Sequence, residues 1–310
     1  MYWLRVLITG GSGFIGSYLT KILLDRDETV VIYGKNNFKA TEKIGKENKN
    51  LHRIEGDIND IGNLMECIHS YNPNFIVHLA AITGIKRCSD LPRESFYVNV
   101  YGTFNVVMAT LKSNAKLIFA SSREVYGETM GEATPENAPL LPNNLYGLTK
   151  LLGEQIIMWA GRKYGLNCTI LRFTNVYGPG GDKYGVQIIV QKALKGEKIQ
   201  ILGGDQDMNF VYVDDVVRAI LLALENKKST KEIFNVGSYD NIKVGDLVHK
   251  IIRLVGRNIE IERAPYRETE TMFFRPDLSK IAKILGWTPQ IDLDTGLLRT
   301  IEWYKDSFSR

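Results

Sequence analysis

The chain is poor in the features that mark secreted, metal-binding and membrane-spanning proteins. Its 310 residues include only three cysteines and four histidines. Cys67, Cys88 and Cys168 are far apart and odd in number, so they provide neither a disulfide framework nor a zinc motif. The histidines lack ligand spacing, and we predict no metal site. No apolar run reaches membrane-spanning length and no signal peptide precedes the first predicted strand, so we expect a cytoplasmic protein.

Charge and composition exclude a nucleic-acid-binding or disordered chain. Lysine and arginine number 39 against 35 aspartates and glutamates, which gives a net charge of +4 with both signs scattered along the sequence. This small excess suits small anionic ligands and forms no basic patch for nucleic acid. The 44% hydrophobic and 24% charged content is typical of a globular protein, and the length allows one large or two modest domains.

The N-terminal stretch carries the pattern of a dinucleotide-binding turn. An apolar run over residues 4–9 predicts a buried parallel strand, and residues 15–23 show helical spacing. The glycines between them permit a tight turn and close approach of the backbone to a pyrophosphate at the helix N-terminus. A glycine-rich turn without a ligand is the alternative. The candidate cofactor contacts are Gly10, Gly13, Phe14, Ile15 and Gly16.

The second predicted strand, residues 30–33, ends without the acidic residue that commonly holds the adenosine ribose of NAD. Gly34 and Lys35 stand there instead. Lys35 is available for a 2′-phosphate, which favours NADP modestly; a solvated Lys35 with NAD held by other contacts is the alternative. Asp57 and Ile58, at the end of the next predicted strand, are candidates for the adenine cradle.

Strands and helices alternate up to residue 173. Apolar runs at 75–81, 116–122 and 168–173 predict strands, and residues 95–111 and 146–160 predict helices. This order implies βαβ units and an α/β fold of Rossmann type, a doubly wound parallel sheet. Ala80 and Ala81 are small enough, at the end of one strand, to let a cofactor approach.

Beyond residue 173 the alternation breaks. We predict that residues 1–173 and about 210–236 form the NAD(P)-binding domain, and that about 174–209 and 237–310 form a smaller α+β substrate lobe. The lobe is expected over the carboxyl edge of the sheet, where ligands bind in open α/β sheets. Asp214 or Asp215 is expected to cap a helix over residues 216–224.

Tyr146 and Lys150 lie on one face of a predicted helix. The lysine ammonium favours the ionised tyrosine and lowers a phenol pKa that is ordinarily about 10. A phenolate near neutral pH is a usable general base toward a sugar hydroxyl. A surface lysine beside a half-buried tyrosine is the alternative for this pair alone.

Seven motifs in register resemble the extended short-chain dehydrogenase/reductase family, in its nucleotide-sugar epimerase/dehydratase branch. They cover nearly the whole chain. The motifs are Thr9-Gly10-Gly11-Ser12-Gly13-Phe14-Ile15-Gly16, His78-Leu79-Ala80-Ala81, Asn99-Val100-Tyr101-Gly102-Thr103, Ser121-Ser122-Arg123-Glu124-Val125-Tyr126-Gly127, Tyr146-Gly147-Leu148-Thr149-Lys150, Arg172-Phe173-Thr174-Asn175-Val176-Tyr177-Gly178-Pro179 and Phe210-Val211-Tyr212-Val213-Asp214-Asp215.

The resemblance implies a catalytic role for three residues. Tyr146 acts as acid and base on the 4-hydroxyl of a nucleotide-sugar, and Lys150 lowers its pKa while binding the nicotinamide ribose. Ser122 hydrogen-bonds the same hydroxyl. Oxidation at C4 gives a 4-keto sugar, from which either epimerisation or elimination can follow. Leu79 and Asn99 join the cofactor contacts.

The resemblance also implies substrate contacts. Asn175 contacts the nucleotide-sugar, and Arg267 falls where the family often keeps an arginine for the diphosphate. Met208 stands where many relatives carry another arginine. Arg267 or Arg275 is expected to compensate.

Glu124 and Arg123 decide between the possible outcomes. The family's dehydratases and decarboxylases commonly carry Glu two positions after the catalytic Ser or Thr, as the base at C5 in the dehydratases, which gives a slight preference for lyase chemistry. Arg123 weakens this preference, because it replaces the usual acid and arginine does not give up its proton. Arg123 is instead a candidate to bind a sugar carboxylate or a phosphate. The alternative for Glu124 is a carboxylate paired with Arg123 or solvated at the pocket rim. The alternative for Arg123 is an ion pair with Glu124 or a neighbouring acid.

We therefore expect an NAD(P)-dependent nucleotide-sugar epimerase/dehydratase with a slight preference for dehydration. The first alternative is an isomerase, namely a UDP-hexose or UDP-uronate 4-epimerase. The second is a non-catalytic NAD(P)-binding scaffold. We expect a nucleotide-diphosphate sugar as substrate, and neither nucleic acid nor membrane as a partner. The helices over 95–111 and 146–160 carry more apolar surface than one buried face needs, and relatives pair through them, so a homodimer is expected.

Overall fold

A seven-stranded parallel sheet forms the centre of the protein. The computed structural model describes residues 4–35, 38, 41, 48–129, 131–181, 185–266, 269 and 271–309. The order of the strands is β11-β7-β5-β4-β1-β2-β3, and every neighbouring pair is parallel. This order confirms the predicted doubly wound sheet. Its strands are β1 (Arg5–Thr9), β2 (Thr29–Gly34), β3 (Leu51–Glu55), β4 (Phe75–His78), β5 (Lys116–Ser122), β7 (Cys168–Phe173) and β11 (Glu232–Val236).

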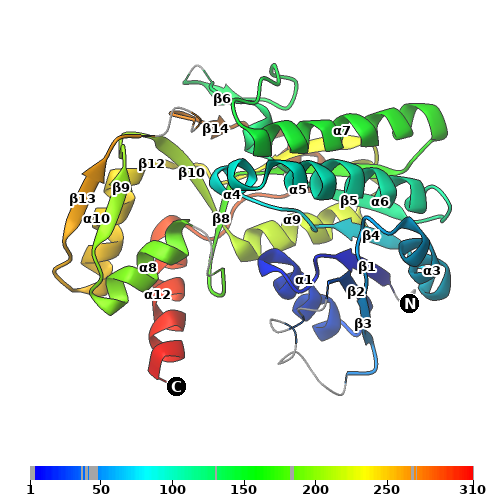
Figure 1. Ribbon diagram of the computed structural model, residues 1–310, viewed down its shortest axis with the longest axis horizontal. Helices are drawn as coiled ribbons and strands as arrows, with labels where there is room; N and C mark the ends of the chain where they lie inside the picture. Colours follow the sequence, from blue (N-terminus) through cyan, green and yellow to red (C-terminus); the bar gives the residue numbers. More distant parts are fainter. Residues whose placement is uncertain are drawn as a thin grey trace.

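Helices cover both faces of this sheet (Figure 1). One face packs against α3 (Ile61–Tyr71), α6 (Gly102–Thr110) and α7 (Leu145–Tyr164), and the other against α1 (Phe14–Asp25) and α9 (Val213–Glu225). Side chains of a strand alternate between the two faces, so Val6 and Ile8 of β1 belong to one core and Leu7 to the other. Burial on both faces explains why the strands read as continuous apolar runs.

Several predicted elements have different limits in the structure. The strands expected over 51–58 and 75–81 end at Glu55 and His78, and the residues that follow form the rim of the sheet. The helix expected over 95–111 is divided into α5 (Pro92–Phe96), a π-helical turn η1 (Tyr97–Tyr101) and α6. Within the described ranges, no helix is long and apolar enough to cross a membrane.

Most of the remaining elements form a lobe at the left of Figure 1, with β8 and β10 next to the main sheet, whereas β6 and β14 lie at the top of the view. Helix α11 packs against β11 of the main sheet. Strands β8, β10 and β12 form one small sheet, β9 and β13 a second, and β6 and β14 a third. The elements are β6 (Ala133–Thr134), β8 (Asn175–Tyr177), α8 (Gly185–Lys195), β9 (Ile199–Leu202), β10 (Asp207–Tyr212), β12 (Asn241–Lys243), α10 (Val244–Val255), β13 (Ile261–Ala264), β14 (Arg275–Pro276), α11 (Ser279–Leu285) and α12 (Leu293–Ser309).

The expected cap of the helix after β10 is wrong. Helix α9 begins earlier than predicted, at Val213, and its N-cap makes no side-chain hydrogen bond. Asp215 lies inside the first turn, where its carboxylate accepts hydrogen bonds from the backbone N–H groups of Gln290 and Ile291. The indole N–H of Trp287 donates to the Asp215 carbonyl at 3.0 Å. Asp215 therefore joins the C-terminal segment to the main sheet.

Candidate active site

The glycine turn between β1 and α1 has the geometry that a dinucleotide requires. Gly10 has φ +73°, and a Cβ on it would lie 2.8 Å from the backbone nitrogen of Ala80. A Cβ on Gly16 would lie 2.5 Å from the Gly10 carbonyl oxygen. The N-cap of α1 is Gly13, so no side chain occupies the helix N-terminus, and its first turn has no acidic residue. This end of α1 therefore fits an anionic pyrophosphate, with Phe14 and Ile15 half-buried beside it.

An ion pair joins the residues that follow the carboxyl ends of β2 and β3. The ammonium of Lys35 lies 2.9 Å from a carboxylate oxygen of Asp57. Burial alone would raise the pKa of Asp57, but hydrogen bonds from Asn59 and the nearby Lys35 ammonium lower it overall. Ile58 is buried, and its carbonyl accepts a hydrogen bond from Asn105 at 3.0 Å. An acidic side chain that is absent from the end of β2 is thus present beside it, two residues after the end of β3.

The carboxyl end of β4 lies next to the glycine turn. Leu79, Ala80 and Ala81 are only half-buried there. Asn99 is buried, and its side-chain amide exchanges hydrogen bonds with the backbone of Ile82 and donates to Thr149 at 3.0 Å. Asn99 therefore fixes the segment after β4 against α7, and its amide is engaged by protein groups.

Helix α7 brings the predicted catalytic residues to the end of β5. Ser122 is the last residue of β5, and its hydroxyl oxygen accepts a hydrogen bond from the Glu124 backbone at 3.2 Å. Tyr146 lies half-buried in the first turn of α7. One turn later, the buried Lys150 ammonium donates to the Ala120 carbonyl of β5 at 2.9 Å. Ser122, Tyr146 and Lys150 therefore belong to one edge of the sheet.

Burial changes the acidity of Lys150. Its ammonium lies 4.9 Å from the centre of the Phe119 ring. Removal from water lowers the pKa of Lys150 to about 8, with Cys88 and Glu154 opposing the shift. A lysine in this range is still largely protonated at neutral pH, as stabilisation of a phenolate requires.

Asn144 orients α7 and was missed in the sequence. Its side-chain oxygen accepts a hydrogen bond from the backbone of Gly147, which makes it the N-cap of α7. Its amide nitrogen donates to the Glu124 carboxylate at 2.8 Å. A Cβ on Gly147 would lie 2.3 Å from the Glu124 carbonyl oxygen, so only glycine permits this approach. An asparagine three residues before a helical glycine was the available signal.

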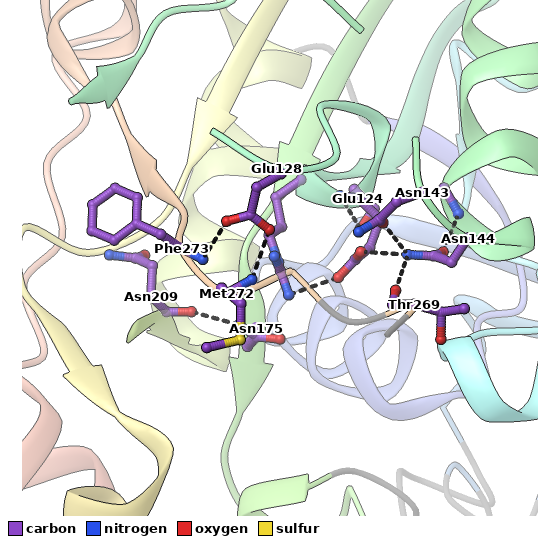
Figure 2. Close-up of polar contacts among 12 residues, drawn as sticks. Glu124, Glu128, Asn143, Asn144, Asn175, Asn209, Thr269, Met272 and Phe273 are labelled. Atoms are coloured by element: carbon purple, nitrogen blue, oxygen red, sulfur yellow. Dashed lines mark hydrogen bonds and ion pairs between the residues drawn. The ribbon is translucent and has the colours of Figure 1, made fainter. Parts of the chain in front are cut away.

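Arg123 and Glu124 form a buried ion pair just beyond Ser122. A guanidinium nitrogen of Arg123, Nη2, lies 2.7 Å from the Glu124 oxygen Oε1. The Arg123 guanidinium also lies 5.8 Å from the centre of the Phe274 ring. Figure 2 shows the other side of the Glu124 carboxylate turned toward Asn144. The ion pair that the sequence left as an alternative is therefore present in the structure.

The predicted substrate residues are spread over the lobe. Asn175, on β8, donates its amide to the Asn209 carbonyl of β10 at 2.9 Å, and both are drawn in Figure 2. Arg275 is exposed on β14, with its guanidinium 6.0 Å from the centre of the Phe273 ring. Met208 is buried in β10 and faces no solvent. Arg267 lies outside the described residues.

Glu128 is a second residue that the sequence did not indicate. Its carboxylate accepts hydrogen bonds from the backbone N–H groups of Met272, at 2.8 Å, and Phe273, at 3.0 Å (Figure 2). These contacts join the segment after Ser122 to the lobe segment that carries Phe274. Because the partners are backbone groups far away in the chain, no local pattern could reveal them.

Known proteins resemble this chain over most of its length. Residues 6–237 match the NAD dependent epimerase/dehydratase family. A Methanocaldococcus jannaschii protein, provisionally named a UDP-glucose 4-epimerase, is 35% identical, with 97% of this chain and 99% of the relative covered. The UDP-N-acetyl-alpha-D-glucosaminuronate decarboxylase of Bacillus cytotoxicus is 31% identical, with 97% and 98% covered.

A solved structure has the same fold. The UDP-glucuronic acid 4-epimerase of Bacillus cereus, in complex with UDP-glucuronic acid and NAD, superimposes with a TM-score of 0.92. It is 26% identical, and the match covers 98% of this chain and 100% of that one. These relatives include both epimerases and a decarboxylase, so they establish the enzyme class and leave the final chemical step open. Taken with the glycine turn and the β5–α7 edge, they show that the chain belongs to the NAD dependent epimerase/dehydratase family, as a nucleotide-sugar enzyme of the extended short-chain dehydrogenase/reductase type.

Proposed function

We propose that this enzyme is a 4-epimerase of UDP-hexoses or UDP-hexuronates. One observation carries the proposal: Tyr146 and the buried ammonium of Lys150 share the first two turns of α7, against the strand that ends in Ser122. An ammonium on the same helical face as a phenol favours the phenolate. A serine hydroxyl at the adjoining strand end supplies a second group for a sugar hydroxyl.

Tyr146, Ser122 and Lys150 each have a different role in the reaction at the C4 hydroxyl. Tyr146, as phenolate, takes the hydroxyl proton, and Ser122 hydrogen-bonds the same oxygen. Lys150 stabilises the charge on Tyr146 and is held in place by its hydrogen bond to Ala120. A bound NAD would supply the oxidising chemistry, taking up the C4 hydrogen with its electron pair and returning it to the opposite face of the 4-keto sugar. In the reverse half-reaction Tyr146 gives its proton back to the C4 oxygen.

Epimerisation is favoured over elimination by the contacts of Glu124. One of its oxygens is held by Arg123 at 2.7 Å and the other by Asn144 at 2.8 Å. These two contacts fix the carboxylate within an ion pair, which favours a structural role for Glu124 over proton abstraction at C5. The slight preference for lyase chemistry that Glu124 gave in the sequence is therefore reversed in this proposal.

Elimination remains the second candidate for a specific reason. Glu124 is buried and lies two positions after Ser122, next to the proposed reacting carbon. A relative of this chain is also a decarboxylase. The products separate the two reactions, because an epimerase yields an isomer of unchanged mass whereas a lyase yields a lighter sugar.

NAD is the proposed cofactor, although Lys35 alone favoured NADP. Lys35 is paired with Asp57, so its charge is already partly neutralised at the position of the adenosine ribose. A carboxylate at this rim suits the ribose hydroxyls of NAD and repels a 2′-phosphate. The similar Bacillus cereus enzyme was solved with NAD.

We also propose a cytoplasmic homodimer. All three cysteines are buried and unpaired, which suits a reducing compartment.

The expected dimer face is smaller than the sequence suggested. Val106, Val107 and Ile157 pack inside the protomer, so they do not contribute to it. The exposed apolar residues of α5, η1 and α7 that remain for it are Phe96, Tyr97, Tyr101, Leu148, Trp159 and Tyr164. Trp159→Glu should convert the dimer to a monomer in sedimentation equilibrium; an unchanged mass would remove this face from consideration.

Tyr146→Phe tests the proposed function directly. The variant should lose about 100- to 10,000-fold in kcat with UDP-glucose or UDP-glucuronate and still retain NAD. Tyr71→Phe is the matched control, because it makes the same change at the end of α3, away from the β5–α7 edge and the proposed dimer face. Product analysis by mass and by sugar stereochemistry identifies the reaction. A fully active Tyr146→Phe variant, or a wild-type protein that converts no nucleotide-sugar, would show the proposal to be wrong.

A further inference from the structure

Two buried arginines near the active site differ in how completely their nitrogens are used. Arg172, on β7, has all three bonded: Nε and Nη2 donate to Glu154, and Nη1 donates to Tyr126 and to the Glu136 carbonyl. Arg123 is 5% exposed, and only Nη2 has a partner, Glu124. Its Nε and Nη1 are buried without a hydrogen-bond acceptor among the described residues.

Unpaired donors on a buried guanidinium are costly, and most such groups in folded proteins have a partner. Glu124 does not supply it, because its carboxylate contacts only Nη2 of the guanidinium and turns its other oxygen to Asn144. The Phe274 ring, 5.8 Å away, supports the guanidinium plane but offers no hydrogen-bond acceptor at its edge. No described residue offers an acceptor to Nε or Nη1, so their partner is either an ordered water or a bound ligand.

We propose that Arg123 binds the C6 carboxylate of a nucleotide-linked hexuronic acid and selects this substrate over the neutral hexose. The inference rests on the proposed function, which places C4 of the sugar at Ser122. Arg123 directly follows Ser122 in the chain. The C6 carboxyl is attached to C5, the direct neighbour of C4. A planar carboxylate also matches the planar fork of a guanidinium.

The diphosphate is the less suitable anion for this position. It is attached at C1, on the opposite side of the sugar ring from C4, and extends away from the ring toward the nucleoside. A group next to the C4 binding residues therefore faces the C5–C6 side of the sugar. Glu124 holds Arg123 on one nitrogen and leaves the other two for the ligand, which fixes the guanidinium in place before the substrate binds.

The test is equilibrium binding of UDP-glucuronate, UDP-glucose and UDP to the NAD-loaded protein by calorimetry. Arg123→Met should weaken UDP-glucuronate by about 10- to 100-fold, the usual effect of losing charge-assisted hydrogen bonds, and leave UDP-glucose and UDP unchanged. Arg123→Met leaves the buried Glu124 carboxylate without its counterion, which can destabilise the protein. The double variant Arg123→Met/Glu124→Gln avoids this problem and should show the same selective loss of UDP-glucuronate affinity. Glu124→Gln alone is the matched control. It keeps the guanidinium and a side-chain oxygen that can accept from it, so the loss of UDP-glucuronate affinity should be much smaller than in Arg123→Met.

The outcomes are distinguishable from those that test the proposed function. Equal weakening of UDP-glucuronate and UDP by Arg123→Met would assign Arg123 to the diphosphate and overturn the inference. Unchanged UDP-glucuronate binding in both Arg123 variants would overturn it too, while leaving C4 epimerisation intact. Failure of the wild-type protein to bind any of the three ligands would reject the inference and the proposed function together. Selective loss of UDP-glucuronate alone would establish the assignment.

Discussion

The glycine turn after β1 and the catalytic edge between β5 and α7 are both built at the carboxyl ends of parallel strands, yet different kinds of contact hold them. The turn depends on backbone approach, where a Cβ on Gly16 would lie 2.5 Å from the Gly10 carbonyl oxygen. The catalytic edge depends on buried charge, with Lys150, the Arg123–Glu124 pair and, beneath them, Glu154 with Arg172. We therefore expect the cofactor side to be sensitive mainly to added volume, and the catalytic side to be sensitive mainly to the loss of a buried charge.

The largest expected effect on stability comes from the buried ion pair between Glu154 of α7 and Arg172 of β7. Glu154 makes two hydrogen bonds to Arg172 and accepts another from Ser121. Glu154→Gln leaves the Arg172 guanidinium buried without a counterion, which should lower the free energy of unfolding by about 3–5 kcal/mol. Urea denaturation at neutral pH measures it. Glu225→Gln is the control, since its ion pair with Arg26 is exposed and should contribute less than about 1 kcal/mol. Equal losses in the two variants would remove the distinction between the two regions.

A smaller effect is expected at the glycine turn. Gly16→Ala should destabilise the protein by about 1–3 kcal/mol, because the new Cβ overlaps the backbone of Gly10 and Gly11. It should also reduce the NAD retained during purification, measured as bound cofactor per protomer. Gly185→Ala makes the same change at the start of α8, where a Cβ meets no atom within 4 Å, and should leave both quantities unaffected. Full NAD content in Gly16→Ala would mean that the turn is not the pyrophosphate site.

The sequence was sufficient for the fold and for the position of the glycine turn because both depend on local patterns. Apolar runs that alternate with helical spacing are readable in the chain, and the glycines of the first turn are required where they stand. Tyr146 and Lys150 were found for the same reason, since they occupy one face of one helix.

The remainder of the site depends on contacts between distant segments. The expected cap at Asp214 or Asp215 was wrong because Asp215 binds a loop more than seventy residues later. The partner of Lys35 is Asp57, just beyond the end of β3, and the partners of Glu128 are backbone groups of Met272 and Phe273. Such pairings follow from the packing of the strands and the lobe. They cannot be predicted from the residues that neighbour each partner in the sequence.

The pH dependence of kcat tests the electrostatics of the catalytic edge. Burial lowers the pKa of Lys150 to about 8, so the ammonium is present below this pH and is lost as the pH rises through it. Loss of the charge weakens the phenolate form of Tyr146, and kcat should fall above about pH 8. Lys150→Arg, which keeps its charge throughout this range, should move the fall to higher pH even if its overall rate is lower. A wild-type rate that continues to rise up to pH 10 would contradict this role of Lys150.

The smallest expected effect concerns the rim at the adenosine ribose, where the charges are exposed and screened. Asp57→Asn removes the partner of Lys35 and frees its ammonium for a 2′-phosphate. Because pairs as exposed as this one contribute about 1 kcal/mol at most, the ratio of NADP to NAD affinity should rise by no more than about fivefold. Fluorescence titration of the reduced cofactors at two salt concentrations measures it, and the gain should shrink at the higher one. Asp25→Asn, which breaks the exposed pair with Lys21 on α1, is the matched control. A much larger change in the affinity ratio would mean that charge also controls the cofactor side. The proposed difference between the cofactor side and the catalytic edge would then be wrong.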